Sequence, residues 1–199
     1  MNKIAITGLG IISPSGIDKR KFWSNVKAGC SAIETITRFD AGKYPSHIAG
    51  HVHELDAYSN VSSRLLKKID LFSHMALVAS EMSIQDAKLD LTKENLTRAG
   101  IFMGNAIGGW LYGETELRDL YIEGREGVSP FMASAWFPAA PQGQISIHYG
   151  MKGYSKTIVS DRASSLMAIA YAAKNLNNGK SDFILAGGME APVTPYALL

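Results

Sequence analysis

The residues most suggestive of chemistry stand at a predicted strand-to-helix turn, where the sequence reads SDRAS from Ser160 to Ser164. The pair Ile158 and Val159 ends an apolar run before this turn, and apolar residues at helical spacing follow it. A sharp strand-to-helix turn is where many enzymes mount a nucleophile. Arg162 occupies the turn and cannot be one, because a guanidinium group donates hydrogen bonds and has no lone pair for attack.

The neighbours of Arg162 leave a second interpretation open. Ser164 and Ser165 are the only hydroxyls close by in the sequence, and no partner base is identifiable for either. Arg162 is also a cation at a predicted helix N-terminus, which the helix dipole disfavours by roughly 0.3–1 kcal/mol. Asp161 can offset that charge and can pair with it. A serine nucleophile is therefore the lesser alternative.

Other clusters carry weaker signals. His47, His51 and His53 lie close together in a segment bounded by Gly and Pro, but their spacing fits no zinc pattern and no cysteine joins them. Gly8-Leu9-Gly10 resembles a dinucleotide fingerprint without its third glycine. The loop from Gly104 to Trp110 lacks the Lys-Ser/Thr of a phosphate-binding loop. We expect no metal and no cofactor.

Composition excludes several classes of function. Hydrophobic residues make up 46% of the 199 residues and charged residues 19%, as in ordinary globular proteins. A net charge of +2 gives no bias towards nucleic acid or an anionic membrane. Cys30 is the only cysteine, which fits a reducing compartment, and no apolar run approaches the roughly 18 residues of a membrane span. We expect a cytoplasmic protein.

Strand-like segments alternate with helical ones along the whole chain. Strands are predicted near residues 3, 101, 157 and 184, and helices over 18–28, 62–88 and 163–176. Asp70 and His74 are spaced to pair on the second of these helices. The alternation predicts a layered α/β fold with a mostly parallel sheet, in one domain covering residues 1–199.

Several stretches resemble the β-ketoacyl synthases of fatty acid and polyketide assembly. They are ITGLGIISPSG, FWSNVKAG, RFDAGKYP, GNAIGGW, SPFM and GGME followed by Thr194-Pro195, and they run collinearly from Met1 to Leu199. The resemblance implies a thiolase-like layered α-β-α fold with a mixed, mostly parallel five-stranded sheet, forming one of the two halves of a ketosynthase. It also implies a soluble dimer that acts with acyl carrier protein.

Two departures from the family change the functional expectation. Arg162 stands where active condensing enzymes of this family carry a cysteine, and the histidines and lysine that serve decarboxylation there belong to the second half, beyond Leu199. We therefore expect no catalytic residue in this chain and no condensation by the chain alone. The alternatives are a decarboxylase or acyltransferase remnant that uses Ser164, and a fragment of a longer ketosynthase.

The chain thus resembles the chain length factors of type II polyketide systems, which have lost the cysteine and pair with an active, full-length ketosynthase. In the family the strand before the turn pairs with its counterpart across the dimer. The resemblance assigns this dimer interface to Lys156, Thr157, Ile158, Val159 and Ser160. An exposed helix face over 163–176 and an open strand edge would both need a partner to cover them.

The resemblance also suggests residues that shape an acyl tunnel. Met132 stands 30 residues before Arg162, as does the family position that closes the tunnel, and Ile107 is a second such position. Phe131 adjoins Met132, and both are alternatively ordinary core residues. A flexible Met at the tunnel end suits a long or varied acyl chain. Aryl polyene biosynthesis is the first hypothesis for the pathway.

Overall fold

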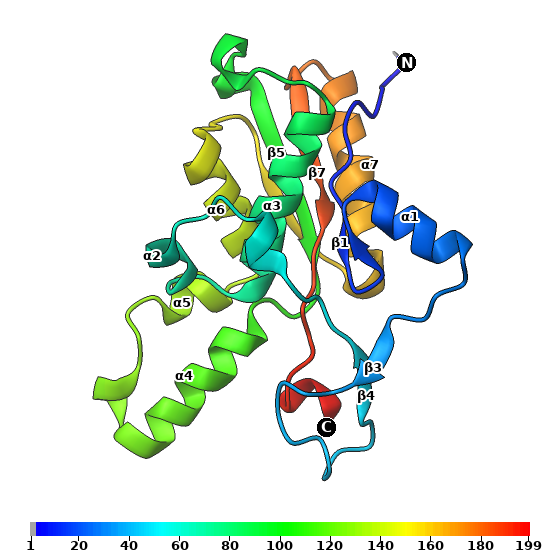
Figure 1. Ribbon diagram of the computed structural model, residues 1–199. Helices are drawn as coiled ribbons and strands as arrows, with labels where there is room; N and C mark the ends of the chain where they lie inside the picture. The colour runs from blue at the N-terminus through cyan, green and yellow to red at the C-terminus, as the bar shows by residue number, and fades with distance from the viewer. Residues whose placement is uncertain (1–2) are drawn as a thin grey trace.

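A sheet of three parallel strands forms the centre of the computed structural model, which describes residues 3–199 (Figure 1). The strands, in their spatial order, are β6 (Lys156–Val159), β5 (Ala99–Asn105) and β7 (Phe183–Gly188). Met103 of β5 lies opposite Thr157 on one side and Gly187 on the other. All seven residues of β5 are buried, as expected for a central parallel strand covered on both faces.

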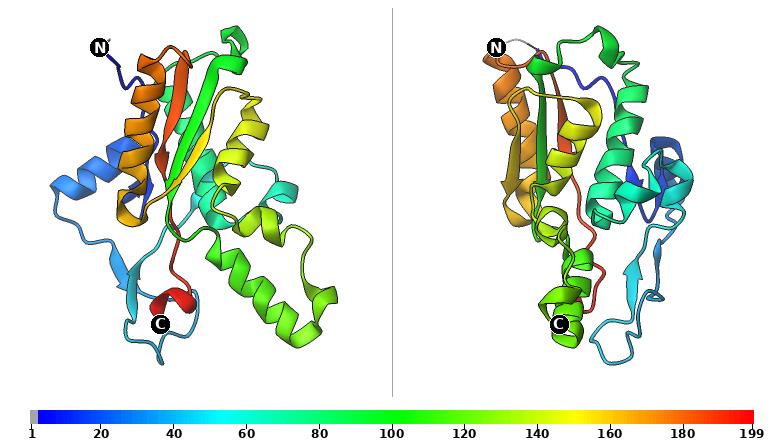
Figure 2. Two further views of the ribbon diagram at one scale, coloured as in Figure 1. Left: turned by 180° about the vertical axis from the view of Figure 1, so that it is seen from behind. Right: turned by 90° about the vertical axis from the view of Figure 1, so that its left-hand side faces the viewer.

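Helices cover both faces of this sheet. One face packs against α7 (Ser164–Asn177), and the other against α3 (Leu71–Asp86) and α6 (Ala140–Tyr149), as the edge-on view in Figure 2 shows. On the α3 side, Leu77 packs with Ile101 in one apolar cluster. The predicted α-β-α layering is confirmed.

The sheet has three strands within residues 3–199, whereas five were expected. The predicted strand near residue 3 takes no regular secondary structure: residues 3–7 are exposed, and Gly8 and Gly10 after them lie against α3. A Cβ atom at Gly10 would lie 1.9 Å from the carbonyl oxygen of Ala79, so only glycine permits the approach. A groove of about 390 Å³ separates residues 8–12 from the outer edge of β7.

The long helix predicted over 62–88 is wrong in one respect, since it is broken into α2 (Ser63–Leu66) and α3. Asp70 causes the break: its Oδ1 accepts a hydrogen bond from the N–H of Phe72 at 2.9 Å and so caps α3. The predicted pairing of Asp70 with His74 is not formed. The Nε2 atom of His74 contacts Ser59 Oγ at 2.7 Å instead.

The remaining elements surround this core. The helix predicted from Asp18 is confirmed. Asp18 Oδ1 caps this helix by accepting the N–H of Arg20 at 2.6 Å. In Figure 1, α4 and the β3–β4 pair project from the body of the molecule. The other helices and strands are β1 (Ile12–Ser13), β2 (Gly16–Ile17), α1 (Lys19–Lys27), β3 (Ile33–Thr35), β4 (Ile48–Gly50), α4 (Trp110–Glu123) and α5 (Met132–Trp136).

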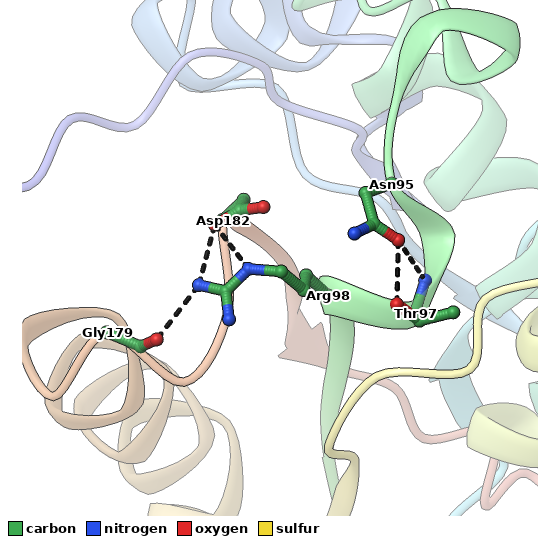
Figure 3. A network of polar contacts seen from close by, with 5 residues as sticks. All are labelled: Asn95, Thr97, Arg98, Gly179 and Asp182. Atoms are coloured by element: carbon green, nitrogen blue, oxygen red, sulfur yellow. Dashed lines mark hydrogen bonds and ion pairs between the residues drawn. The ribbon is translucent and has the colours of Figure 1, made fainter.

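A polar network joins the amino ends of β5 and β7 to the end of α7 (Figure 3). The guanidinium of Arg98 donates to Asp182 Oδ1 at 2.8 Å and to the carbonyl oxygen of Gly179 at 2.9 Å. Asn95 caps the turn before Arg98 by accepting from the N–H of Thr97 at 3.1 Å. This corner therefore fixes where two of the three strands begin.

Candidate functional site

The turn between β6 and α7 has the geometry of a nucleophile elbow without the nucleophile. Asp161 adopts φ = 48°, a left-handed conformation that is uncommon for a residue with a side chain and that clusters at functional sites. Arg162 follows it with an exposed side chain. Its guanidinium makes no hydrogen bond or ion pair with any residue from 3 to 199, so the pairing considered for Asp161 and Arg162 is not formed.

Two glycines allow the start of α7 to lie directly on the sheet. A Cβ atom at Gly104, in β5, would lie 2.4 Å from the backbone of Ser164, and one at Gly188, in β7, would lie 2.4 Å from Ser165 Cβ. Glycine is the residue that permits such close backbone approach. The turn is thereby held at the carboxyl ends of the strands, the edge of a parallel sheet at which ligands bind.

Ser164 holds the turn together and is not arranged as a nucleophile. Its hydroxyl is buried, with 3% of the residue exposed. Ser164 Oγ accepts the N–H of Ser160 at 2.8 Å, and its single hydroxyl hydrogen is shared between the carbonyl oxygens of Asp161 at 2.7 Å and Asn105 at 3.0 Å. None of these partners is a base, and activation of a serine requires one.

A pocket of about 460 Å³ opens between this turn and the ends of β5 and β7. Its walls combine a glycine-rich loop, the Arg162 turn and the segment after β7. The lining residues are Gly104, Asn105, Ala106, Ile107, Asp161, Arg162, Ser164, Ser165, Gly188, Met189, Glu190 and Pro192. One cation, Arg162, and two carboxylates, Asp161 and Glu190, therefore share one concave surface.

Glu190 lines this pocket, although it was not among the predicted site residues. Its Oε2 accepts the N–H of Ala106 at 2.5 Å, while its Oε1 is buried without a hydrogen-bond partner. Burial raises the pKa of Glu190 above its ordinary value, and the N–H groups of Ala106 and Ile107 act in the opposite direction. Its only sequence signal was its place at the end of the GGME stretch, two positions after Gly188.

The structure separates the three residues suggested for an acyl tunnel. Ile107 lines the same pocket as Arg162. Phe131 and Met132 do not line it, and lie where α5 begins. Phe131 is 37% exposed, and Lys68 Nζ stands 4.4 Å from the centre of its ring. Within one chain, these positions therefore do not form a single cavity.

The strand suggested as a dimer interface lies at an edge of the sheet. β6 pairs with β5 on one side, and no strand among residues 3–199 pairs with its other side. Ile158 is buried against α7, Val159 is 54% exposed, and Ser160 lies just beyond the strand. Lys156 Nζ stands 4.7 Å from the ring centre of Tyr171 on α7.

The histidine segment forms no metal centre. Among the described residues, no group of three or more His, Cys, Asp or Glu side chains is placed to hold a metal ion. His51 is buried, which lowers its pKa, and His53 pairs with Glu34.

Across residues 3–199, no helix is both long enough and apolar enough to cross a bilayer.

Comparison with known proteins agrees with this geometry. The family described as "Beta-ketoacyl synthase, N-terminal domain" matches residues 1–199. The tetracenomycin polyketide synthase ketoacyl synthase beta subunit of Streptomyces glaucescens is 38% identical over 98% of this chain and 48% of its own length. The 3-oxoacyl-[acyl-carrier-protein] synthase 2 of Staphylococcus aureus strain COL is 33% identical over 98% of this chain and 47% of its own length.

Solved structures of ketosynthases are also similar to this chain. One is described as a type II polyketide synthase acyl carrier protein in complex with its ketosynthase bound to the hexaketide. It is 36% identical with a TM-score of 0.80, over 97% of this chain and 52% of that one. The ishigamide ketosynthase/chain length factor, 24% identical, shares the fold with a TM-score of 0.87 over 97% of this chain and 48% of that one.

The chain spans about half the length of the curated relatives that it matches. The family match covers all of it, and the layered fold with its elbow at the carboxyl ends of parallel strands is the one that the motifs implied. This chain therefore belongs to the β-ketoacyl synthase family, has its thiolase-like fold, and corresponds to its N-terminal domain.

Proposed function

We propose that this chain acts as a non-catalytic subunit of the chain-length-factor type, which pairs with a full-length, cysteine-bearing ketosynthase. The observation that carries the proposal is Arg162 on an intact elbow. The turn, the pocket and the close packing of α7 are all present, but the side chain presented there cannot attack a thioester. Ser164 offers no substitute, because its hydroxyl bonds to backbone groups.

Exposed apolar side chains on the surface of the chain support the proposed pairing. Beyond the open edge of β6, three apolar side chains of α7 are exposed: Leu166 at 72%, Ile169 at 43% and Tyr171 at 39%. Exposed apolar faces next to an unpaired strand are typical of interaction sites. The proposal assigns the β6 edge, residues 156–160, to the interface with the ketosynthase.

Within that pair, the proposal gives Ile107, Phe131 and Met132 the role of shaping the acyl tunnel. Phe131 and Met132 lie outside the pocket of their own chain and near an exposed surface, as residues that reach into a partner's tunnel would. The acyl chain would arrive on an acyl carrier protein, as in the solved ketosynthase complex. We propose type II polyketide assembly in the cytoplasm as the setting, with aryl polyenes as the first product class to assay.

Co-expression with a cysteine-bearing ketosynthase from the same genome tests the pairing. We expect a complex of one copy of each chain by size-exclusion chromatography with light scattering. Val159→Asp should weaken it more than tenfold, because it places a charge on the exposed strand edge.

Val26→Asp on α1 is the matched control, since Val26 is also exposed, at 45%, and lies outside the proposed interface. It should leave the complex unchanged. A stable monomer of this chain with no affinity for the ketosynthase, or equal effects of the two substitutions, would overturn the pairing.

A further inference from the structure

A half-buried carboxylate, that of Glu190, holds the loop that carries Ile107. Glu190 Oε2 accepts the N–H of Ala106, the residue directly before Ile107, at 2.5 Å. The loop lies beyond the end of β5, so the strand ladder does not hold this N–H group. Glu190 reaches it from the segment after β7, 84 residues away in the chain.

A second carboxylate does the same for the segment that carries Phe131 and Met132. Glu116, on α4, is 7% exposed, and its Oε2 accepts the N–H of Ser129 at 2.5 Å. Tyr112, one helical turn earlier, donates its hydroxyl hydrogen to Ser129 Oγ at 2.9 Å. One face of α4 therefore fixes the position at which this segment begins.

Neither carboxylate has a cationic partner. Glu190 and Glu116 form no ion pair with any residue from 3 to 199, although burying an unpaired carboxylate is costly. Hydrogen bonds from N–H groups to a carboxylate are among the stronger ones in proteins. These side chains therefore serve to hold two backbone segments, and each segment carries residues assigned to the tunnel.

We propose that Glu190 and Glu116 are positioning residues that set the chain length of the product, by fixing the Ile107 loop and the Phe131–Met132 segment. This inference rests on the proposed function, because it assumes that these segments shape a tunnel. Each carboxylate determines where a tunnel-lining side chain stands. Loss of the bond releases the loop and changes the length of acyl chain that fits.

Amide hydrogen exchange tests the holding role in the purified chain, alone or in its complex. Glu190→Met keeps the size of the side chain and removes the acceptor, so exchange at Ala106 should accelerate at least tenfold. Glu190→Gln retains an acceptor oxygen and should leave the rate within about twofold of wild type. Glu116→Met and Glu116→Gln should behave in the same way at Ser129.

The product-length distribution of the complex tests the functional part. Both Met variants should shift the main product by at least one extension unit, and both Gln variants should restore the wild-type length. Glu114→Met is the matched control. Glu114, also on α4, accepts the N–H of Tyr196 at 2.7 Å and holds the C-terminal turn, so its loss should not change product length.

The outcomes separate this inference from the pairing itself. Unchanged exchange in the Met variants would overturn the holding role. Faster exchange with unchanged product length, or an equal shift in Glu114→Met, would overturn control of chain length. If the wild-type chain forms no complex, the proposed function fails, whereas the exchange measurement still decides whether the carboxylates hold the loops.

Discussion

Charged side chains are paired at one end of the parallel sheet and unpaired at the other. At the amino ends of the strands, Arg98 pairs with Asp182 and also bonds to the carbonyl oxygen of Gly179. At the carboxyl ends, Arg162 and Glu190 line one pocket, yet neither forms an ion pair with a described residue. The first end joins elements of the fold, while the second carries charges that the fold does not neutralise.

This difference separates structural charge from charge available to a site. Local rules of folding are satisfied at the Arg98 corner and broken at the Arg162 turn, where Asp161 is left-handed and a cation precedes a helix. Departures of this kind are expected where function outweighs stability. The following substitutions test the contrast, starting with the largest expected effect.

Replacement of Asp70 by Ala should destabilise the protein most. Asp70 is 3% exposed and accepts the N–H groups of Phe72 at 2.9 Å and Tyr112 at 2.6 Å, so its loss leaves two N–H groups unpaired. We expect the free energy of unfolding in urea to fall by about 2–4 kcal/mol.

Asp90→Ala is the control for that loss. Asp90 also caps a short helix, by accepting the N–H of Thr92 at 3.1 Å, but it is exposed to solvent. Its loss should cost less than about 1 kcal/mol. Equal losses for the two variants would contradict the role given to burial.

Glu190→Gln should change how stability depends on pH. Burial raises the pKa of Glu190 above its ordinary value of 4.5, so the folded state binds the proton more tightly than the unfolded state does. The contribution of Glu190 to the free energy of unfolding is therefore largest below pH 4.5 and decreases as pH rises to the raised pKa.

The measurement is the difference in unfolding free energy between wild type and Glu190→Gln across pH 4–8. Wild type should lose stability relative to the variant as pH rises through this window, and the difference should level off above the raised pKa. A flat difference, or one of opposite sign, would show that burial does not dominate the pKa of Glu190.

Arg98→Ala should have a smaller effect. The ion pair with Asp182 is exposed to solvent, and exposed pairs contribute about 1 kcal/mol or less. Thermal unfolding at low salt should show this loss, and 1 M NaCl should reduce it through screening. A loss that is independent of salt would instead implicate the hydrogen bond to Gly179.

Arg162→Ala should have the smallest effect and the opposite sign. Removing a cation that precedes α7 relieves an unfavourable interaction with the helix dipole, so stability should rise by a few tenths of a kcal/mol. Lys174→Ala is the control: Lys174 lies in the last turn of α7, where a cation is favourable, so its removal should lower stability slightly. A loss of stability in Arg162→Ala would indicate that Arg162 has a structural role.

The elements with continuous apolar patterns could be predicted from the sequence. The strands β5, β6 and β7 and the helix α7 lie where short apolar runs and helical spacing predicted them. The prediction of a strand near residue 3 was wrong, because a local apolar pattern does not show whether a neighbouring strand is available for pairing. The prediction of one continuous helix over 62–88 was wrong, because Asp70 caps a new helix in the middle of a continuous apolar pattern.

The site was predictable only where one residue type decides the chemistry. Arg162 excludes a nucleophile whatever its surroundings. Neither the GGME stretch around Glu190 nor the surroundings of Glu116 predicted what these carboxylates bind, since their partners are backbone N–H groups, which every residue but proline has. Which N–H group a carboxylate reaches depends on tertiary packing.

The most direct test of the central claim is condensation by the reconstituted pair of this chain and its ketosynthase. The pair with Arg162→Ala should retain its activity, while replacement of the ketosynthase cysteine by Ala should abolish all product. Product from the cysteine-less pair, or decarboxylation of a malonyl carrier protein by this chain alone, would contradict the claim that the chain is not catalytic.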